Sequence, residues 1–432
     1  MLKNLATGFA LYTPNVGEQN QIKGLLSQLV RDNGKNEAAR FVFNWNIFAE
    51  SVENRSLRLS DYENYRDFEK AVFLSLDAYF GKRLWIPRIF VTAYTQGENE
   101  KAAFNEDAVC RAVKAYYEKR GRGKVVTVIM TARAHDYRWA DIVNVPGHMA
   151  DDEDKAKILK QPEKFFVSVG IVHNMTKTFI RQKFGQKRLQ KLIKQIEHGR
   201  PNIVFCLGGR TNGNDIVFDL KNAAKIWEKA LMLEKRGYNI IFVNGHRTPN
   251  DVCDYFYEHS LKNENIRFFN AKKIAADDRE RNPENWRVYS GKHEDDFRLQ
   301  QKEYGNVYPG ILGLKNTLAV HTFDSFASCE TASSGVPTAV CRDVDINHET
   351  RPDCYRLAEQ MIAGGYAVDF ADFVSQIIFK HAADFDKNSI QTKLSKNQNF
   401  VSLTCIIPAT SKIQLDNLYS DLSKNPLIKF VL

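Results

Sequence analysis

The stretch LAVHTFDSFASCETASSGVPTAV, residues 318–340, decides the fold class of this 432-residue chain. The apolar run Asn316–Phe323 predicts a buried strand, and Asp324 or Ser325 then caps a helix that begins directly after it. A second apolar run, Pro337–Arg342, predicts the next strand. A strand, a helix and a strand at this spacing form a βαβ unit, and such units build parallel sheets.

Outward from this unit, short apolar runs alternate with amphipathic stretches along the chain, which predicts an α/β protein of two doubly wound domains. The predicted strands of the first half are Thr7–Pro14, Ala39–Asn46, Pro87–Thr95, Lys124–Thr131, Ala140–Pro146 and Lys164–Val172. Apolar i, i+3 and i+4 spacing predicts helices there over Gly17–Asp32 and Glu106–Arg120. The second half adds strands at Ile203–Gly209, Tyr238–Gly245 and Ile266–Asn270, and helices at Val217–Arg236 and Asn250–Leu261.

The composition is that of an ordinary soluble protein, with 43% hydrophobic and 26% charged residues. These values exclude a disordered, a fibrous and a disulfide-scaffold class. The seven cysteines include no CxxC pair, which is typical of reduced thiols in a cytosol. No run approaches the roughly 18 apolar residues of a spanning helix, so we expect a cytoplasmic protein, peripheral at most on the inner face of the cytoplasmic membrane.

The net charge of +9 is divided unevenly along the chain. Residues 1–200 hold 33 Lys and Arg against 23 Asp and Glu, whereas residues 201–432 hold 28 against 29. Most of the surplus lies in Lys177–Arg200, where apolar residues at near-helical spacing predict a basic amphipathic helix at the end of the first domain. One interpretation of this helix is that Lys183, Lys187, Lys191 and Lys194 bind an anionic membrane surface. The other is a linker helix that packs its apolar stripe while its lysines stay solvated.

The loop after the strand at Ile203–Gly209 carries groups suited to a phosphate. Gly208 and Gly209 let backbone amides approach an anion closely, and Arg210 offers a bidentate guanidinium, with Thr211 and Asn212 beside it. The alternative is a plain glycine turn, since glycine is the ordinary residue of βα loops.

Two further loops follow strands in the same half, at the edge where open α/β sheets bind ligands. Arg247 and Thr248 come after one of them. At the other, the Ser325 and Ser328 hydroxyls and the first-turn amides form an anion site, and Glu330 is placed to accept the hydroxyls of a ribose. The alternative there is a capped helix with an exposed glutamate. Together the three loops describe a nucleotide-diphosphate site.

Five stretches, in order along most of the chain, resemble the mitochondrial-fission ELM (elongated mitochondria) family, a GT-B glycosyltransferase-like group. They are GEQNQ from Gly17 with Gly24-Leu25, VPGHMADDEDKAKILKQPEKFFVSVGIVHNMT, CLGGRTNG, NGHRTP, and GNVYPGILGL running into HTFDSFASCETASSGVP. The family usually has V-P-E-H-D where this chain has VPGHM, so Gly147 and Met149 replace acidic residues and His148 persists. The chain also lacks the family's serine before the arginine of NGHRTP and its arginine loop after the third strand.

The resemblance implies a GT-B fold, two doubly wound Rossmann-like domains facing across a cleft. Residues 1–200 would form an acceptor domain ending in the basic helix, and residues 201–384 a nucleotide-sugar-binding domain. Residues 385–432 form an extension of unknown role. On the acceptor side, the resemblance points to Gly17, Asn20 and His173.

A sugar transfer that inverts the anomeric centre needs a general base. His148, placed after a predicted strand, is the first candidate, and Glu18 and His173 follow. Neither HxH nor HExxH spacing occurs, so we expect no metal and no required cofactor.

The sequence therefore predicts a glycosyltransferase that moves a sugar from a nucleotide donor to an envelope glycan or lipid-linked acceptor, in lipopolysaccharide or capsule assembly. Nucleic acid is not an expected partner, because zinc-finger, RRM and bZIP motifs are absent. Two alternatives stay open: an enzyme like the nucleotide-sugar 2-epimerases, and a non-enzymatic membrane adaptor of the fission-factor type.

Overall fold

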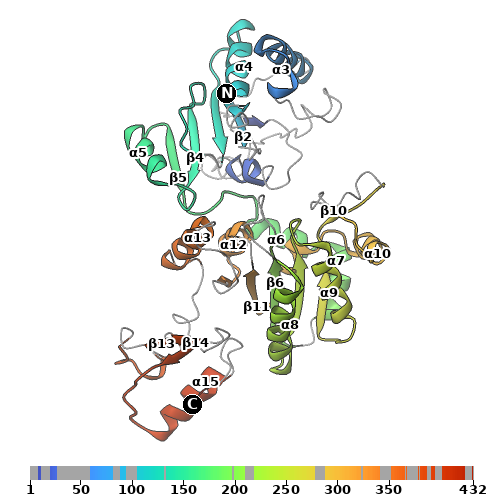
Figure 1. Ribbon diagram of the computed structural model, residues 1–432, viewed down its shortest axis with the longest axis vertical. Helices are drawn as coiled ribbons and strands as arrows, with labels where there is room; N and C mark the ends of the chain where they lie inside the picture. Colours follow the sequence, from blue (N-terminus) through green and yellow to red (C-terminus); the bar gives the residue numbers. More distant parts are fainter. Residues whose placement is uncertain are drawn as a thin grey trace, which may run out of the picture. The chain divides into compact units, whose positions relative to one another are not determined.

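The computed structural model divides the chain into two units, Met1–Thr176 and Lys177–Leu432 (Figure 1). The part of the chain that it describes comprises residues 8–10, 20–26, 59–80, 88–93, 105–130, 133–196, 199–209, 218–277, 288–322, 325–340, 352–364, 366, 378, 380–386, 391–394, 401–423 and 431. All statements below concern these residues.

Unit 1 is built on a parallel sheet. Its strands are β1 (Gly8–Ala10), β2 (Ile89–Ala93), β3 (Val126–Met130), β4 (Ile142–Pro146) and β5 (Phe165–Ser168), hydrogen-bonded in that order. Each lies within a predicted strand, which confirms five of the six predictions for this half. The sixth, Ala39–Asn46, lies outside the described residues.

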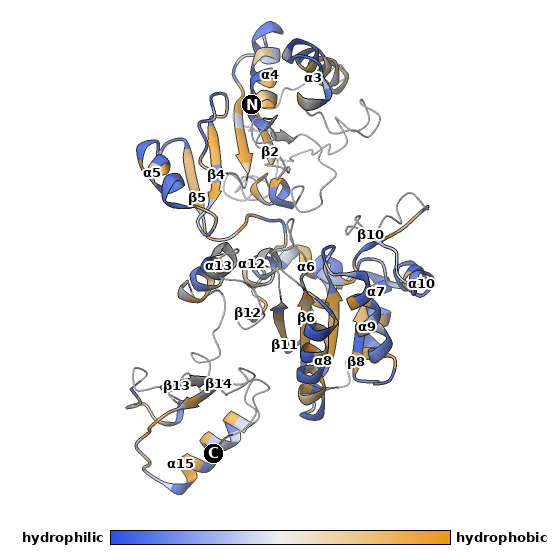
Figure 2. Ribbon diagram, viewed as in Figure 1, coloured by the Kyte–Doolittle hydropathy of each residue, from blue (hydrophilic) through white to orange (hydrophobic). Residues whose placement is uncertain are grey.

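Helices cover both faces of this sheet, as expected of a doubly wound fold. They are α3 (Tyr65–Phe80), preceded by the 3-10 turn η1 (Leu59–Asp61), α4 (Asn105–Lys119), α5 (Asp152–Lys160) and the helical residues 20–26. Alternate residues of β3 enter different cores: Ile129 packs with α3 and α4, whereas Val128 and Met130 pack with Ile22 and Leu26. Figure 2 shows the resulting hydrophobic strands.

Unit 2 contains a second parallel sheet, of order β12-β11-β6-β7-β8. Its strands are β6 (Asn202–Leu207), β7 (Asn239–Asn244), β8 (Ile266–Phe269), β11 (Thr317–Thr322) and β12 (Thr338–Val340). All five fall on predicted strands. A short parallel pair, β9 (Lys273–Ile274) and β10 (Val288–Tyr289), was not predicted.

The helices of this part of unit 2 include those predicted at Val217–Arg236, at Asn250–Leu261 and after Asp324. They are α6 (Lys177–Phe184), α7 (Lys187–Ile196), α8 (Leu220–Lys235), α9 (Asn250–Ser260), α10 (Glu294–Tyr304), α11 (Tyr308–Ile311), α12 (Ser325–Ser333) and α13 (Pro352–Ala363). Phe205 and Phe242 pack against Trp227 of α8 and Phe256 of α9. The intervening residues of β6 and β7 are buried as well, so both faces of this sheet are covered.

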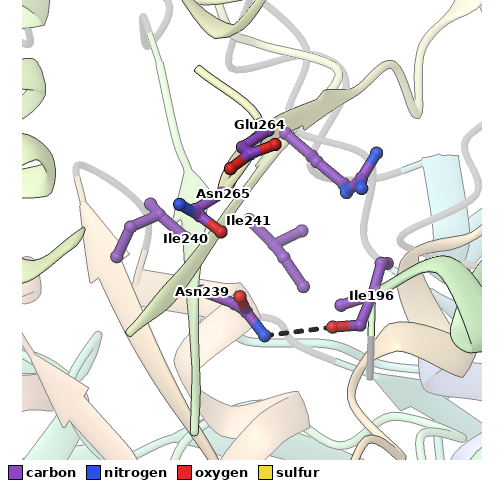
Figure 3. Close-up of a pocket in the computed structure, with 7 residues that line it drawn as sticks. Ile196, Asn239, Ile240, Ile241, Glu264 and Asn265 are labelled. Atoms are coloured by element: carbon purple, nitrogen blue, oxygen red, sulfur yellow. Dashed lines mark hydrogen bonds between the residues drawn. The ribbon is translucent and has the colours of Figure 1, made fainter. Parts of the chain in front are cut away.

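The predicted division at residue 200 is wrong, because residues 177–196 pack within unit 2. They form two helices, α6 and α7, in place of one, with a break at Gly185-Gln186. The end of α7 is tied to β7, where the Asn239 amide donates to the Ile196 carbonyl at 3.0 Å beside a small pocket that Ile196 and Ile241 also line (Figure 3). The apolar stripe that the sequence shows thus belongs to the second unit.

This boundary also changes where the positive charge lies. Residues 1–176 hold 25 Lys and Arg against 22 Asp and Glu, a net of +3. Residues 177–432 hold 36 against 30, a net of +6. The predicted contrast between a basic first domain and a nearly neutral second one is therefore wrong.

The C-terminal part of the chain has a hydrophobic cluster of its own. Its elements are the antiparallel strands β13 (Gln391–Leu394) and β14 (Val401–Thr404), and the helix α15 (Lys412–Ser423). Leu418 and Leu422 of α15 pack with Ile378, Ala382 and Phe385. Packing of this kind across the predicted start at residue 385 indicates that the C-terminal segment begins earlier.

Asp107 at the start of α4 anchors the loop between β3 and β4, and its removal gives a first prediction. Its buried carboxylate accepts the backbone N–H groups of Arg138, Trp139 and Ala140 at 2.8–3.0 Å. We expect Asp107→Ala to lower the free energy of unfolding by about 3 kcal/mol, since it strands buried donors. Chemical denaturation measures this, with Asp136→Ala, whose side chain is 83% exposed, as the control. Equal effects of the two variants would contradict the anchoring role.

Candidate donor site and acceptor-side residues

Three strands of unit 2 end at the same level, so the loops that follow them lie at one edge. Thr322 of β11 pairs with Leu207 of β6, and Leu207 pairs with Asn244 of β7. The predicted anion-binding loops begin directly after these three residues. The sheet thus brings together the Gly208-Gly209 turn, the loop of Arg247 and the start of α12, as predicted.

The first two loops are in direct contact through a glycine. A Cβ atom on Gly209 would lie 1.9 Å from the Arg247 carbonyl oxygen and 2.6 Å from the Thr248 nitrogen. The Gly208 N–H donates to the Thr322 carbonyl at 2.7 Å, and the Gly245 N–H donates to the Leu207 carbonyl at 2.8 Å. Only glycine allows this approach, so the turn is more than a plain connection.

Thr248 holds the two loops together and does not face a ligand. Its side chain is fully buried, and its hydroxyl lies 2.8 Å from the Gly208 carbonyl, 3.0 Å from the Leu207 carbonyl and 3.0 Å from the Gly245 N–H. These backbone groups use its donor and acceptor capacity. The predicted contact between the Thr248 hydroxyl and a phosphate is therefore wrong, whereas Arg247 beside it is half-exposed.

A buried lysine that sequence reasoning missed supports the same loop. Lys272 is 1% exposed, and its ammonium donates to the Thr248 carbonyl and the Asn250 side-chain oxygen, each at 2.9 Å. Burial lowers the pKa of this amine. Asn244 adds a second link, since its amide donates to Asn270 at 2.8 Å. No local motif marks Lys272, because its partners lie more than 20 residues away in the sequence.

The third loop leads into α12, which begins at Ser325. Glu330 is half-buried at the side of this helix and accepts a hydrogen bond from the Tyr308 hydroxyl at 3.1 Å. Ser328 is fully buried, with its hydroxyl 3.3 Å from the sulfur of Met361 in α13. It therefore faces the interior, and the prediction that it binds a phosphate is wrong. Its spacing placed it on the helix without showing which face would be covered.

Thr322 is a residue of this edge that the sequence did not single out. It ends β11, it is 1% exposed, and its hydroxyl forms no hydrogen bond with any residue that the structure describes. The side chain of the neighbouring His321 is hydrogen-bonded, since its Nε2 lies 2.7 Å from the Thr331 hydroxyl. Thr322 is therefore a buried polar group just before α12 begins.

Several predicted donor-site groups lie outside the described residues. They are Arg210, Thr211, Asn212 and the side chain of Ser325. Their contacts with a nucleotide stay predictions. The described part of the site consists of the Gly209 amide, Arg247, the first turn of α12 and Glu330. The predicted contact of the Gly208 amide with a phosphate is wrong, because that N–H donates to the Thr322 carbonyl.

Of the residues predicted for the acceptor side, the structure brings Asn20 and His173 onto neighbouring segments. Asn20 is one helical turn from Gly24, and a Cβ on Gly24 would lie 2.4 Å from the His173 carbonyl carbon and oxygen. The His173 Nδ1 accepts the Met175 N–H at 3.0 Å. Gly17 and Glu18 lie outside the described residues.

His148 lies in the turn after β4 and is fully buried. The turn is fixed at both sides, since the Gly147 N–H donates to the Ser168 carbonyl at 3.0 Å and the Met149 N–H donates to the Pro146 carbonyl at 2.9 Å. Its role as a general base stays a prediction.

The contact at Gly24 gives a second prediction. We expect Gly24→Ala to destabilise the protein by about 2 kcal/mol, because the new methyl group meets backbone atoms that cannot rotate away. Gly185→Ala is the matched control, since its Cβ would meet nothing closer than 3.4 Å. Urea denaturation compares the two variants, and a stability of Gly24→Ala equal to that of the parent would show that the helix does not pack on His173.

The acidic run at residues 151–154 caps a helix and forms ion pairs with Arg133. Asp151 and Asp154 form a capping box at the start of α5, and both accept hydrogen bonds from Arg133. Among the described residues, no group of three or more His, Cys, Asp or Glu side chains could hold a metal ion. Nor is any described helix long and apolar enough to cross a membrane.

Two doubly wound Rossmann-like units in one chain, with loops gathered at the carboxyl edge of the second sheet, define a protein of the GT-B class. Residues 108–289 match the family model described as mitochondrial fission ELM1, and this match runs across both units. This match confirms that the chain resembles that GT-B-like family, as its motifs indicate.

The C-terminal segment matches a model of its own, and the chain has curated relatives. Residues 361–432 match a second model, described as a protein of unknown function (DUF493). A UPF0250 protein of Nitrosomonas europaea is 38% identical over 71 residues, which is 16% of this chain and 82% of that protein. A UPF0250 protein of Bordetella pertussis is 32% identical over 71 residues and 78% of its length. The chain therefore belongs to the UPF0250 family. The segment that matches the second model begins at residue 361, before the predicted residue 385.

Among solved structures, the chain is similar to two UDP-GlcNAc 2-epimerases. That of Methanocaldococcus jannaschii is 12% identical, with a TM-score of 0.41 over 82% of this chain and 91% of the other. That of Neisseria meningitidis, bound to UDP-GlcNAc, is 12% identical, with a TM-score of 0.37 over 83% and 92%.

Proposed function

We propose that this protein is a glycosyltransferase that takes a sugar from a nucleotide donor and transfers it to an envelope glycan or lipid-linked acceptor. The donor is assigned to unit 2, and the acceptor to unit 1. The match of residues 108–289 to the ELM1 family model supports the class of protein. The observation that carries the proposal is the contact of Gly209 with Arg247 and Thr248, because it sets an arginine against a glycine turn at the sheet edge where α12 begins.

These groups match the chemistry of a leaving nucleotide. Negative charge develops on the diphosphate as the bond to the sugar breaks, and preorganised donors stabilise it. The amide of Gly209, the N–H groups of the first turn of α12 and the Arg247 guanidinium are donors of this kind. Glu330, oriented by Tyr308, is an acceptor suited to the ribose hydroxyls. No metal or cofactor is part of this proposal.

The acceptor hydroxyl must lose its proton during transfer. In an inverting reaction, His148 or His173 would take it, with Glu18 as the third candidate; a retaining reaction needs no protein base. The proposed setting is lipopolysaccharide or capsule assembly on the cytoplasmic side of the membrane.

The test measures nucleotide release from a panel of nucleotide sugars, with and without a lipid and glycan extract of envelope membranes. Release that depends on the extract supports transfer. Conversion of the sugar without an acceptor would favour an epimerase-like reaction instead. Failure of every nucleotide to bind would overturn the donor site and favour a non-enzymatic adaptor.

A further inference from the structure

Helix α7 presents a dense row of cations on its outer side. Lys187, Arg188, Lys191 and Lys194 are all exposed, and residues 187, 191 and 194 follow the spacing of one helical face. The whole segment from Lys177 to Arg200 carries eight Lys and Arg against one acidic residue. On α6, the Lys183 ammonium lies over the Phe179 ring, 5.3 Å from its centre.

The apolar side of α7 is already used inside unit 2. Leu189, Leu192, Ile193 and Ile196 are each at most 3% exposed. The fit is close, since a Cβ on Gly310 of α11 would lie 1.8 Å from a methyl carbon of Leu189. This helix therefore has no apolar face left to insert into a bilayer, and any ligand of its outer side is bound by charge.

The four cations form no ion pair or hydrogen bond through their side chains with any residue that the structure describes. Like charges one turn apart on a helix repel each other and lower its stability. Ten residues of α-helix span about 15 Å, close to the screening length of about 10 Å in 0.1 M salt, so the charges act together. A surface that opposes them with negative charge removes this repulsion.

We propose that the outer face of α7 docks the chain on an anionic phospholipid surface, by electrostatic attraction and without insertion. A flat array of headgroups meets all four cations at once, whereas a single phosphate meets one or two. The helix contains no aromatic side chain on which a nucleobase could stack, which argues against a single-stranded nucleic acid. Because this face belongs to unit 2, docking anchors the unit that carries the candidate donor site.

This inference does not depend on the proposed sugar transfer. The experiment is flotation of the full chain with vesicles of equal parts phosphatidylcholine and phosphatidylglycerol, against vesicles of phosphatidylcholine alone. The test variant replaces Lys187, Arg188, Lys191 and Lys194 by glutamine. The control variant replaces the exposed lysines Lys221, Lys225, Lys229 and Lys235 of α8 by glutamine, which changes the net charge by the same amount on a helix of the same unit.

We expect the parent and the α8 variant to float with the anionic vesicles at low salt. Neither should float in about 1 M salt, because the screening length there is only about 3 Å. Each cation removed from α7 lowers vesicle binding about five-fold, so the test variant loses several hundred-fold. Equal loss in the two variants would show that total charge is responsible, and would overturn the proposal. So would no flotation of the parent, or flotation that persists in high salt. An unchanged thermal melt of the α7 variant separates lost binding from lost folding.

Discussion

Replacing Gly209 by alanine is expected to abolish nucleotide binding and to lower the free energy of unfolding by about 3 kcal/mol. The added methyl carbon would lie 1.9 Å from the Arg247 carbonyl oxygen and 2.2 Å from its carbonyl carbon. Both are backbone atoms, so one loop must move as a whole. That movement breaks the contact of the Thr248 hydroxyl with Gly208 and displaces Arg247.

Two measurements on this variant check the expectation: a urea melt and a calorimetric titration with nucleotide diphosphates. Gly185→Ala serves as the control, because its methyl group meets nothing closer than 3.4 Å. A Gly209→Ala protein that binds a nucleotide as tightly as the parent would mean that the contact between the two loops does not form the site.

Replacing Arg247 by alanine is expected to weaken nucleotide binding about 10- to 100-fold and to leave stability nearly unchanged. A hydrogen bond to a charged group contributes about 1.5–3 kcal/mol, which corresponds to this range. The side chain is half-exposed, so its removal opens no cavity in the core. Lysine at the same position should restore part of the affinity, since it keeps the charge but loses the planar bidentate geometry.

The control for this prediction is Arg236→Ala, at the C-terminal cap of α8. That residue precedes β7, whereas Arg247 follows it, so the two arginines lie at opposite ends of the strand. Calorimetry with the best-bound nucleotide compares the two variants with the parent. If both variants weakened nucleotide binding equally, the total charge of the protein, and not a contact of Arg247 with phosphate, would be responsible.

The strands were predictable because they are buried on both faces. β6 and β7 have six consecutive buried residues each, and such apolar runs stand out between amphipathic stretches. Parallel pairing then fixes which ends of the strands meet. The gathering of the three loops at one edge of unit 2 followed from that rule, before any contact was known.

The unit boundary was not predictable, because periodicity shows that a helix has an apolar face without showing what covers it. The stripe of α7 would pack equally well on either sheet. Its actual partners, Asn239 and Gly310, lie more than 40 residues further along the chain. The same limit hid the break at Gly185 that divides the segment into α6 and α7.

Side-chain direction explains the errors within the site. Thr248 and Ser328 have the residue type of a phosphate ligand, yet both hydroxyls turn inward to groups that the local sequence does not reveal. Lys272 shows the reverse case, a charged residue whose buried contacts give it a positioning role that no motif marks. Contacts of high sequence separation decide both outcomes.

The central claim is that unit 2 binds a nucleotide at the loops after β6, β7 and β11. Calorimetric titration of the full chain with UDP, GDP and CMP tests it most directly. The account predicts that one of them binds with a dissociation constant of about 1 µM to 1 mM, the usual range for enzyme substrates, and that Arg247→Ala weakens this binding. No heat of binding with any nucleotide, or binding that Arg247→Ala leaves unchanged, would contradict it.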